Sequence, residues 1–358
     1  MERIGHEVWF YYVSFQPGEQ EIMRSHWGEH YLSYHYCKPW RKYQLWGIPI
    51  PDRWSHTLVS RGWVSQKIDQ FYDDHMQKTL CEFQIEHNFD AVVVNYVFFS
   101  KALETFPDTV LKVIDTHDVY TDRHKRLLEN DLRPDWFFTS REEEKKGLER
   151  ADKVIAIQSR EADFFSKLLG RETGVETVGH LFDPPGKSQI VPVQNPLRFG
   201  MLGSNNLLNV QALRWFMEKV AGNLPDDFTL KLWGSVCDSI PDHPKIRKMG
   251  IVENLATAYQ EADVFLNPMQ WGTGLKIKTL EALSYGRLVI STPCGLEGID
   301  DAESEGCWME KTAEGWIRRI RGMLDGKKDY SSASQSNLDY TRQYLEENRS
   351  ALRRIFNT

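Results

Sequence analysis

Residues 270–286 read QWGTGLKIKTLEALSYG and decide how the rest of the chain is interpreted. Two glycines, Gly272 and Gly274, come first, and a helix-forming stretch follows them. The apolar run DVFLNP (263–268) precedes this stretch and the apolar run LVIST (288–292) follows it. Two buried strand-like runs with a helix between them predict a β–α–β unit in a parallel sheet.

The predicted helix carries a cation and a carboxylate in a fixed order. Gly274, Lys278 and Glu281 are spaced i, i+4 and i+7, which predicts that they share one helix face, whereas Lys276 lies off that face. Bare glycine backbone and a helix amino terminus attract anions, and the glutamate follows about 10 Å further on. A diphosphate attached to a ribose fits this order, with Lys278 on the phosphates and Glu281 on the ribose hydroxyls. The spacing alone also fits a turn followed by a surface Lys–Glu pair.

The composition is typical of a soluble globular protein and argues against several classes of protein. Its 358 residues suffice for two domains, and 41% of them are apolar and 27% charged. The net charge of −7 argues against general nucleic-acid binding. Five cysteines without a CxxC motif argue against a zinc site or a disulfide framework and favour a cytosolic chain. The polar start MERIGHEV is not a signal peptide, and no apolar run reaches the length of a membrane span.

Strands alternate with helices along both halves, which predicts an α/β fold with two domains. Residues 1–192 are predicted to form an amino-terminal domain and residues 193–330 a second one, and residues 331–358 an amphipathic helix that crosses back to the first. The proline-rich segment 180–196 is interpreted as the linker. The charged run 141–150 is interpreted as a solvated helix. The expected strands lie within residues 5–15, 90–99, 109–118, 151–159, 196–203, 228–235, 263–269 and 288–292.

With these motifs placed, residues 199–299 resemble the donor domain of GT-B glycosyltransferases, in particular retaining family 4. FGMLGSNNLLNVQALRWF (199–216) resembles the family's first strand, glycine turn and helix, and GTGLKIKTLEALSYGRLVISTPCGLEGI (272–299) is the most specific part. The likeness extends over roughly residues 90–300. It implies two Rossmann-like domains facing across a cleft. The implied activity is transfer of a sugar, with retention, from a nucleotide-diphosphate sugar to a glycan or lipid-linked acceptor in polysaccharide or glycoconjugate synthesis.

The resemblance assigns the donor-binding residues one by one. Glu281 matches the second glutamate of the family's E-x7-E motif, and the first, which contacts the donor sugar, falls on Thr273. Gly203 matches the first glycine turn, and Ser204 stands where relatives often carry a phosphate-binding arginine. Lys278 or Lys276 would replace that charge, and Lys278 is preferred because it shares a face with Glu281.

Further donor contacts follow from the same likeness. Gly272 and Gly274 supply backbone amides, and Val252 offers its backbone to the base. The resemblance implies no permanently bound cofactor and no metal, because amides and cations neutralise the diphosphate.

On the acceptor side, His117 and Asp118 end an apolar strand, where ligand sites of parallel sheets lie. The family places a histidine of this region beside the donor sugar, so both residues are assigned to catalysis. The alternative is that Asp118 caps the following helix and His117 is structural. Retaining transfer of this kind is drawn as front-face substitution in which the leaving diphosphate takes the acceptor proton. No protein nucleophile is therefore assigned.

Two other regions bear on partners and activity. Residues 34–54 combine Trp, Tyr, Lys and Arg, which suits peripheral contact with the inner face of the membrane, although a packed region of the acceptor domain is the favoured interpretation. The chain is expected to be cytoplasmic, with a nucleotide sugar and a glycan as partners and no nucleic acid. Gly5 reads as the residue after a helix, so the first strand and glycine loop of the first domain are expected to be missing.

Two alternatives to an active transferase remain open. A catalytically degenerate GT-B subunit would explain Thr273, Ser204 and the short amino terminus, but not the retained Lys278 and Glu281. A GT-B epimerase would be expected to carry more carboxylates and histidines at its site.

Overall fold

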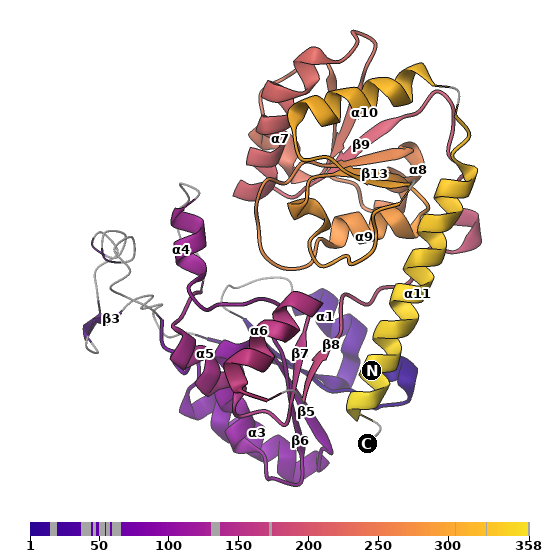
Figure 1. The fold of residues 1–358 in the computed structure, drawn as a ribbon. Coiled ribbons are helices and arrows are strands. Elements are labelled where there is room, and N and C mark those ends of the chain that lie inside the picture. The colour runs from indigo at the N-terminus through magenta and orange to yellow at the C-terminus, as the bar shows by residue number, and fades with distance from the viewer. Residues whose placement is uncertain are drawn as a thin grey trace. The chain divides into compact units, whose positions relative to one another are not determined.

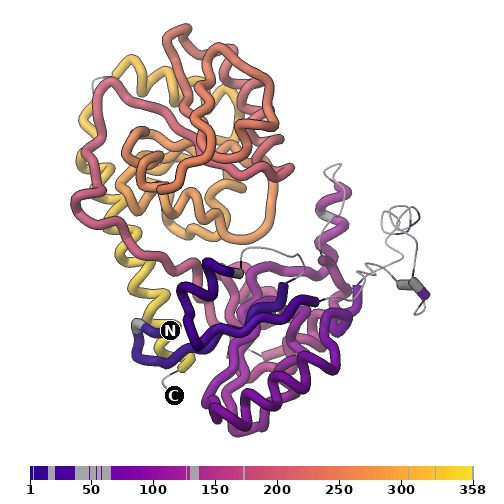
Figure 2. The backbone as a smooth tube through the Cα atoms, turned by 180° about the vertical axis from the view of Figure 1, so that it is seen from behind, coloured from indigo at the N-terminus to yellow at the C-terminus, as the bar shows by residue number. Residues whose placement is uncertain are grey.

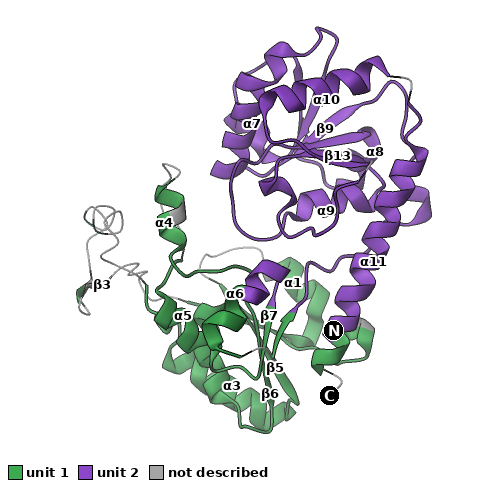
Figure 3. Cartoon of the chain, in the orientation of Figure 1, with its two compact units in different colours: residues 1–155, 164–176, 353–358 green, residues 156–163, 177–352 purple. Residues whose placement is uncertain are grey.

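The computed structural model describes residues 1–14, 20–36, 66–129, 137–171, 174–304, 306–326 and 328–356, with isolated positions at 44–45, 48–49, 54 and 58. The chain forms two compact units (Figure 3). The first contains residues 1–155, 164–176 and 353–358, and the second contains residues 156–163 and 177–352. Each unit is described by itself.

The second unit contains a six-stranded parallel sheet with the order β11-β10-β9-β12-β13-β14. This order, in which the first and fourth strands lie side by side, is that of a doubly wound nucleotide-binding domain. The strands are β9 (Phe199–Leu202), β10 (Leu230–Trp233), β11 (Ile246–Gly250), β12 (Val264–Asn267), β13 (Leu288–Ser291) and β14 (Cys307–Met309). The helices are α7 (Leu207–Lys219), α8 (Leu255–Glu261), α9 (Ile277–Ser284), α10 (Ala313–Asp325) and the first part of α11 (Ser331–Phe356).

Both faces of this sheet are covered, which explains why its strands read as continuous apolar runs. Alternate strand residues such as Leu232, Leu266 and Ile290 pack against α7 and α10. The residues between them, such as Phe265 and Val289, pack against α8 and α9. In Figure 1, α7 and α10 accordingly lie on one side of β9 and β13, and α8 and α9 lie on the other.

The first unit holds two parallel sheets. A four-stranded sheet has the order β5-β6-β7-β8, and β1 pairs in parallel with β2, so that the two run side by side in Figure 2. The strands are β1 (Phe10–Ser14), β2 (Tyr31–His35), β5 (Ala91–Asn95), β6 (Leu111–Asp115), β7 (Lys153–Ala156) and β8 (Val175–Thr177). The helices are α1 (Gln20–Trp27), α3 (Asp74–His87), α4 (Arg123–Leu128), α5 (Arg141–Leu148) and α6 (Ser159–Leu169).

The amino terminus opens with a strand–helix–strand unit. Glu2–Ile4 form a 3₁₀ turn that ends at Gly5, whose φ of 96° is the left-handed geometry expected after a helix, and β1, α1 and β2 follow. Residues 15–19, which connect β1 to α1, lie outside the described residues. The expectation that a first strand and glycine loop are missing stays a prediction.

Several expected boundaries differ from the structure. The strand expected within residues 90–99 ends at Asn95, because Tyr96 adopts a φ of 70° and a 3₁₀ helix (Val97–Thr105) follows. The segment 180–196 belongs to the second unit rather than forming a separate linker. Helix α11 runs through both units, with residues from 353 onward in the first. Most of the aromatic segment 34–54 lies outside the described residues.

Candidate functional site

The second unit places its site loops at the junction of β9 and β12. From these two neighbouring strands the chain leaves toward opposite faces of the sheet. Doubly wound sheets bind their ligands at such a point, outside the carboxyl ends of the strands. The residues after β9 include Gly203 and Ser204, and those after β12 include Gly272, Thr273 and Gly274. The predicted glycine turn and glycine loop therefore both follow strands that meet at this junction.

The turn after β9 is tight because the backbone of the next strand end lies against it. The Gly203 amide donates to the Trp233 carbonyl (3.0 Å), and the Gly203 carbonyl accepts from the Val236 amide (3.2 Å). A Cβ atom at Gly234 would overlap the Gly203 carbonyl oxygen, so glycine is required there as well. Ser204, which follows, is exposed to solvent.

The loop before α9 is held by a buried lysine. Gly272 and Gly274 adopt φ values of 152° and 72°, which favour glycine. Lys276, 5% exposed, donates from Nζ to the carbonyl oxygens of Thr273 (3.0 Å) and Gly274 (2.7 Å). Lys276 is thus committed to the loop backbone, whereas Lys278 lies on the helix that follows.

One detail of the predicted helix is wrong. Helix α9 begins at Ile277, with Lys276 as its amino-terminal cap, so Gly274 lies in the loop and not on the helix face. The left-handed backbone at Gly274 is the physical reason, because a right-handed helix cannot continue through it. Lys278 and Glu281 remain on the helix, three residues apart.

Lys278 connects α9 to the turn after β9. Its Nζ donates to Oδ1 of Asn209 (2.8 Å) in the first turn of α7, and Nδ2 of Asn209 donates to the carbonyl (3.0 Å) and Oγ (3.3 Å) of Ser204. Burial, and secondarily the positive charge of Lys276, lower the pKa of Lys278 to about 8. The predicted residues Gly203, Ser204 and Lys278 are therefore brought together through Asn209.

Asn209 is the residue that the sequence interpretation missed. It is 7% exposed and shares the buried face of α7 with Leu213 and Phe216, at spacing i, i+4 and i+7. Its polar side chain within an apolar helix face could have identified it, because a buried polar group needs hydrogen-bond partners.

Glu281 is held by a tyrosine from α8. The hydroxyl of Tyr259 donates to Oε2 of Glu281 (2.8 Å), and the ring of Tyr259 stacks on that of Tyr285 (4.8 Å between centroids). Burial raises the pKa of the Glu281 carboxyl. Val252, after β11, packs against the same apolar cluster as Tyr259.

The first unit carries a separate polar group at the ends of β5 and β6. His117 Nε2 lies 3.4 Å from Oδ1 of Asn95 and 3.6 Å from Oδ2 of Asp115, and its ring lies 4.7 Å from that of Tyr96. Both His117 (φ 58°) and Tyr96 (φ 70°) have positive backbone φ values, a strain that clusters at functional sites. Burial raises the pKa of Asp115, and the nearby His117 opposes this.

Asp118 does not cap the following helix. Its Oδ1 accepts from the Val119 amide (2.9 Å) and its Oδ2 lies 3.3 Å from Nε of Arg123, whereas the cap of α4 is Asp122. The capping alternative is therefore wrong, and the catalytic assignment of His117 and Asp118 stays a prediction.

Helix α5 is not fully solvated, contrary to the expectation for residues 141–150. Glu144 is fully buried and accepts hydrogen bonds from the amides of Tyr120 (2.9 Å) and Thr121 (2.7 Å) and from the Thr121 hydroxyl (2.5 Å). Burial raises the pKa of Glu144 to about 7 although these bonds favour the anion. Glu144 thereby fixes the loop that follows His117 and Asp118.

No described helix has the length and apolar character that a membrane span needs. No group of three or more His, Cys, Asp or Glu side chains among the described residues is arranged as metal ligands.

Comparisons with known proteins agree with this architecture. Residues 196–326 match the family Glycosyl transferases group 1. The matched residues are similar to glycosyltransferases of group 1, and the fold is that of GT-B glycosyltransferases. A search of curated proteins gives no match.

Three solved structures illustrate the likeness. Alr3699/HepE from Anabaena, solved with UDP and glucose, is 11% identical, with a TM-score of 0.58 over 98% of this chain and 100% of that one. A glycosyltransferase from Rickettsia africae ESF-5 is 14% identical, with a TM-score of 0.55 over 78% and 80%. The lipopolysaccharide outer core galactosyltransferase WaaB is 12% identical, with a TM-score of 0.52 over 77% and 78%. At these identities the likeness establishes the fold, and the predicted α/β fold with two Rossmann-like domains is confirmed.

Proposed function

We propose that this protein is a retaining glycosyltransferase that moves a sugar from a nucleotide-diphosphate sugar to a glycan or lipid-linked acceptor. The observation that carries the proposal is the pair Lys278 and Glu281 on α9, with Lys278 bonded to Asn209, which in turn bonds Ser204 after β9. A cation and a carboxylate one helical turn apart, at the crevice of a doubly wound sheet, suit a diphosphate and its ribose.

Each donor-site residue has a role in this proposal. The bare backbone of Gly203 lets the diphosphate approach the turn, and the backbone amides at Ser204, Gly272 and Gly274 and the ammonium of Lys278 neutralise it. Glu281 accepts hydrogen bonds from the ribose hydroxyls, and the backbone at Val252 meets the base. UDP is the first candidate nucleotide, since the similar Alr3699/HepE and the pneumococcal O-GlcNAc transferase GtfA were both solved with UDP.

The transfer step in the proposal needs no covalent enzyme intermediate. The bond from the anomeric carbon to the diphosphate oxygen breaks, and the acceptor oxygen attacks from the same face. The leaving diphosphate takes the acceptor proton, and Lys278 stabilises the negative charge that develops on it. His117 and Asp118 are the catalytic residues in this proposal. The reaction runs in the cytoplasm.

A second candidate function rests on Thr273. A threonine stands where the resembling family has a sugar-contacting glutamate, which favours a GT-B subunit that binds nucleotide without transferring sugar. The two candidates differ in turnover and not in nucleotide binding.

The test is a transfer assay with UDP-glucose, UDP-galactose and UDP-N-acetylglucosamine, followed by proton NMR of the released or transferred sugar. An active retaining enzyme gives an initial product with the α configuration of the donor, and Lys278→Met lowers the rate at least about 10-fold. An initial β product would exclude retention. Nucleotide binding without any hydrolysis or transfer would favour the non-catalytic subunit.

A further inference from the structure

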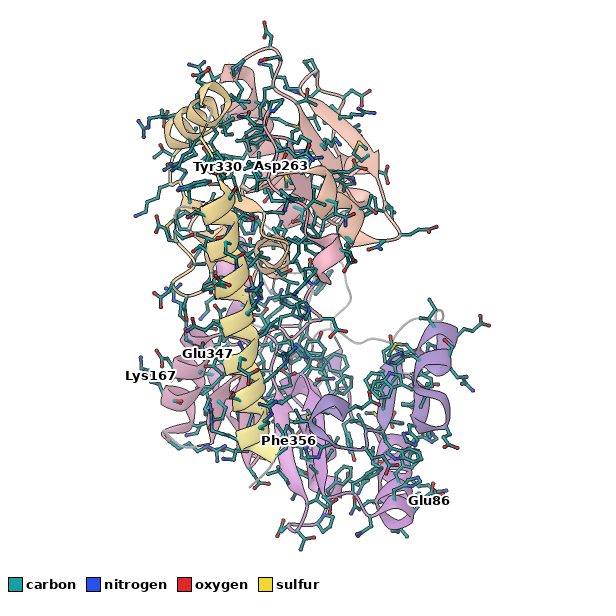
Figure 4. The ribbon with its side chains drawn as sticks, turned by 90° about the vertical axis from the view of Figure 1, so that its right-hand side faces the viewer. Glu86, Lys167, Asp263, Tyr330, Glu347 and Phe356 are labelled. Carbon is teal, nitrogen blue, oxygen red and sulfur yellow. The ribbon has the colours of Figure 1, made fainter. Side chains whose placement is uncertain are left out.

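A second hollow lies at the edge of the six-stranded sheet. Its volume is about 510 Å³, and it is formed by β14, α10 and the residues before α11. Figure 4 labels Tyr330 at the upper end of α11, where the hollow is situated. Strand β13 separates β14 from β12, so the hollow is distinct from the junction of β9 and β12.

Two aromatic rings form walls of this hollow. The rings of Trp308 and Tyr330 lie 6.1 Å apart between centroids, at an angle of 79°. Tyr330 is 8% exposed, so its ring is fixed by packing, and Trp308 is partly buried on the edge strand. Aromatic rings that combine apolar faces with a polar edge suit ligands of mixed polarity, such as sugars.

Cations surround these rings. The Arg319 guanidinium lies 5.2 Å from the Trp308 ring centroid and the Lys328 ammonium lies 5.7 Å from that of Tyr330. Arg318 also lines the hollow; its side chain is exposed, and its positive charge acts on Glu314 one turn earlier on α10. The one acidic side chain in the lining, Glu310, pairs with Nε of Arg319 at 2.9 Å.

The lining of the hollow therefore carries more positive than negative charge. It holds three cations and one carboxylate, in a chain whose net charge is −7. Glu310 pairs with Arg319 and not with Arg318. The planar guanidinium of Arg318 can therefore donate two parallel hydrogen bonds to the carboxylate of a ligand. A volume of this size is in the range of small-ligand sites, roughly 300–1,000 Å³.

We propose that this hollow is a second saccharide site, which binds a glycan carrying carboxylate groups. The sugar rings lie against Trp308, whose position is fixed by the buried Tyr330, and the carboxylate pairs with Arg318, close to Lys328. The proposal rests on the proposed function in one respect, namely that the ligand is a glycan. It goes beyond that function because it assigns a second binding site, separate from the donor site, to an acceptor glycan that carries negative charge.

The test is calorimetric titration of the full chain with a hyaluronan hexasaccharide, which carries glucuronate, and with neutral maltohexaose. Hyaluronan binding is expected to weaken by about 10-fold in Arg318→Ala, which is the loss of one charge-assisted contact. Lys311→Ala, which removes an exposed charge from the same segment but does not line the hollow, should leave binding unchanged. Binding should also weaken as sodium chloride is raised.

Three outcomes would overturn the proposal. These are equal binding of maltohexaose, no binding of hyaluronan, or binding of sodium sulfate as tight as that of the hexasaccharide. UDP titrated into the same samples separates this proposal from the first one. Binding of UDP without binding of hyaluronan would refute only the proposed saccharide site in the hollow. Binding of hyaluronan without binding of a nucleotide would refute only the proposed donor site.

Discussion

At the residue scale, the direction of the Lys278 side chain depends on Asn209. The ammonium donates to Oδ1 of Asn209, while the amide nitrogen of the same side chain donates to Ser204. Asn209 therefore fixes the positions of both the Lys278 ammonium and the turn at Ser204, which are the groups that the proposed diphosphate would contact. The sequence could not reveal this link, because 69 residues separate Asn209 from Lys278.

Replacing Asn209 should weaken nucleotide binding without removing any proposed ligand contact. Asn209→Ala is expected to raise the Kd for UDP about 10-fold, because Lys278 and the turn at Ser204 lose a shared charge-assisted partner. Gln211→Ala, the loss of an amide side chain from the same helix, is the matched control and should leave the Kd unchanged. If the Kd for UDP were unchanged in Asn209→Ala, Asn209 would not be needed to position Lys278 for nucleotide binding.

The pKa of Lys278 predicts how nucleotide binding depends on pH. The side chain is protonated below about pH 8 and neutral above it, so UDP affinity should fall as the pH rises from 7 to 9. Binding should also take up a fraction of a proton near pH 8, measurable by calorimetry in buffers of different ionisation enthalpy.

Lys278→Arg supplies the comparison, because arginine keeps its charge throughout this range. This variant should show no loss of UDP affinity between pH 7 and 9. Parallel pH profiles for the two proteins would contradict the assignment of Lys278 to the diphosphate.

At the element scale, α9 and α5 show what the sequence could and could not predict. The apolar runs on both sides of α9 were sufficient to place it between two parallel strands. Its start was placed too early, since the left-handed backbone at Gly274 cannot be read from spacing alone. For α5 the charge run predicted a helix correctly, but its burial depends on backbone amides at Tyr120 and Thr121 that approach from a distant segment.

Glu144 makes a stability prediction for α5. Its pKa in the folded chain is about 7, above the ordinary value of 4.5, so the folded state holds the proton more strongly than the unfolded state. The stabilisation is fully present below about pH 4.5 and is lost as the pH rises to about 7, at up to ~1.4 kcal/mol per pH unit.

Urea unfolding of the wild type and Glu144→Gln between pH 5 and pH 8 measures this effect. Glu144→Gln should be less stable at every pH, because an amide cannot accept all three hydrogen bonds. The difference between the two proteins should shrink as the pH rises toward 7. A difference that stays constant with pH would mean that Glu144 does not titrate in this range. Glu142→Gln, on the exposed side of the same helix, is the control.

At the scale of the whole molecule, the alternation of strands and helices predicted two α/β domains, and the division of the chain was harder to predict. Both α6 and α11 run from one compact unit into the other, so neither unit is a continuous stretch of sequence. The periodicity of apolar residues identifies helices and strands, but it does not show against which hydrophobic core each end of a long helix packs.

In the proposed function, the second unit binds a nucleoside diphosphate through α9. The decisive experiment is calorimetric titration of UDP, GDP and dTDP into the wild type and Glu281→Ala, with Glu218→Ala, which removes an exposed carboxylate from α7, as the control. We expect UDP to bind, its Kd to rise at least about 10-fold in Glu281→Ala, and the control to match the wild type. Binding that is unchanged in Glu281→Ala, or the absence of binding by all three nucleotides, would contradict the donor site described above.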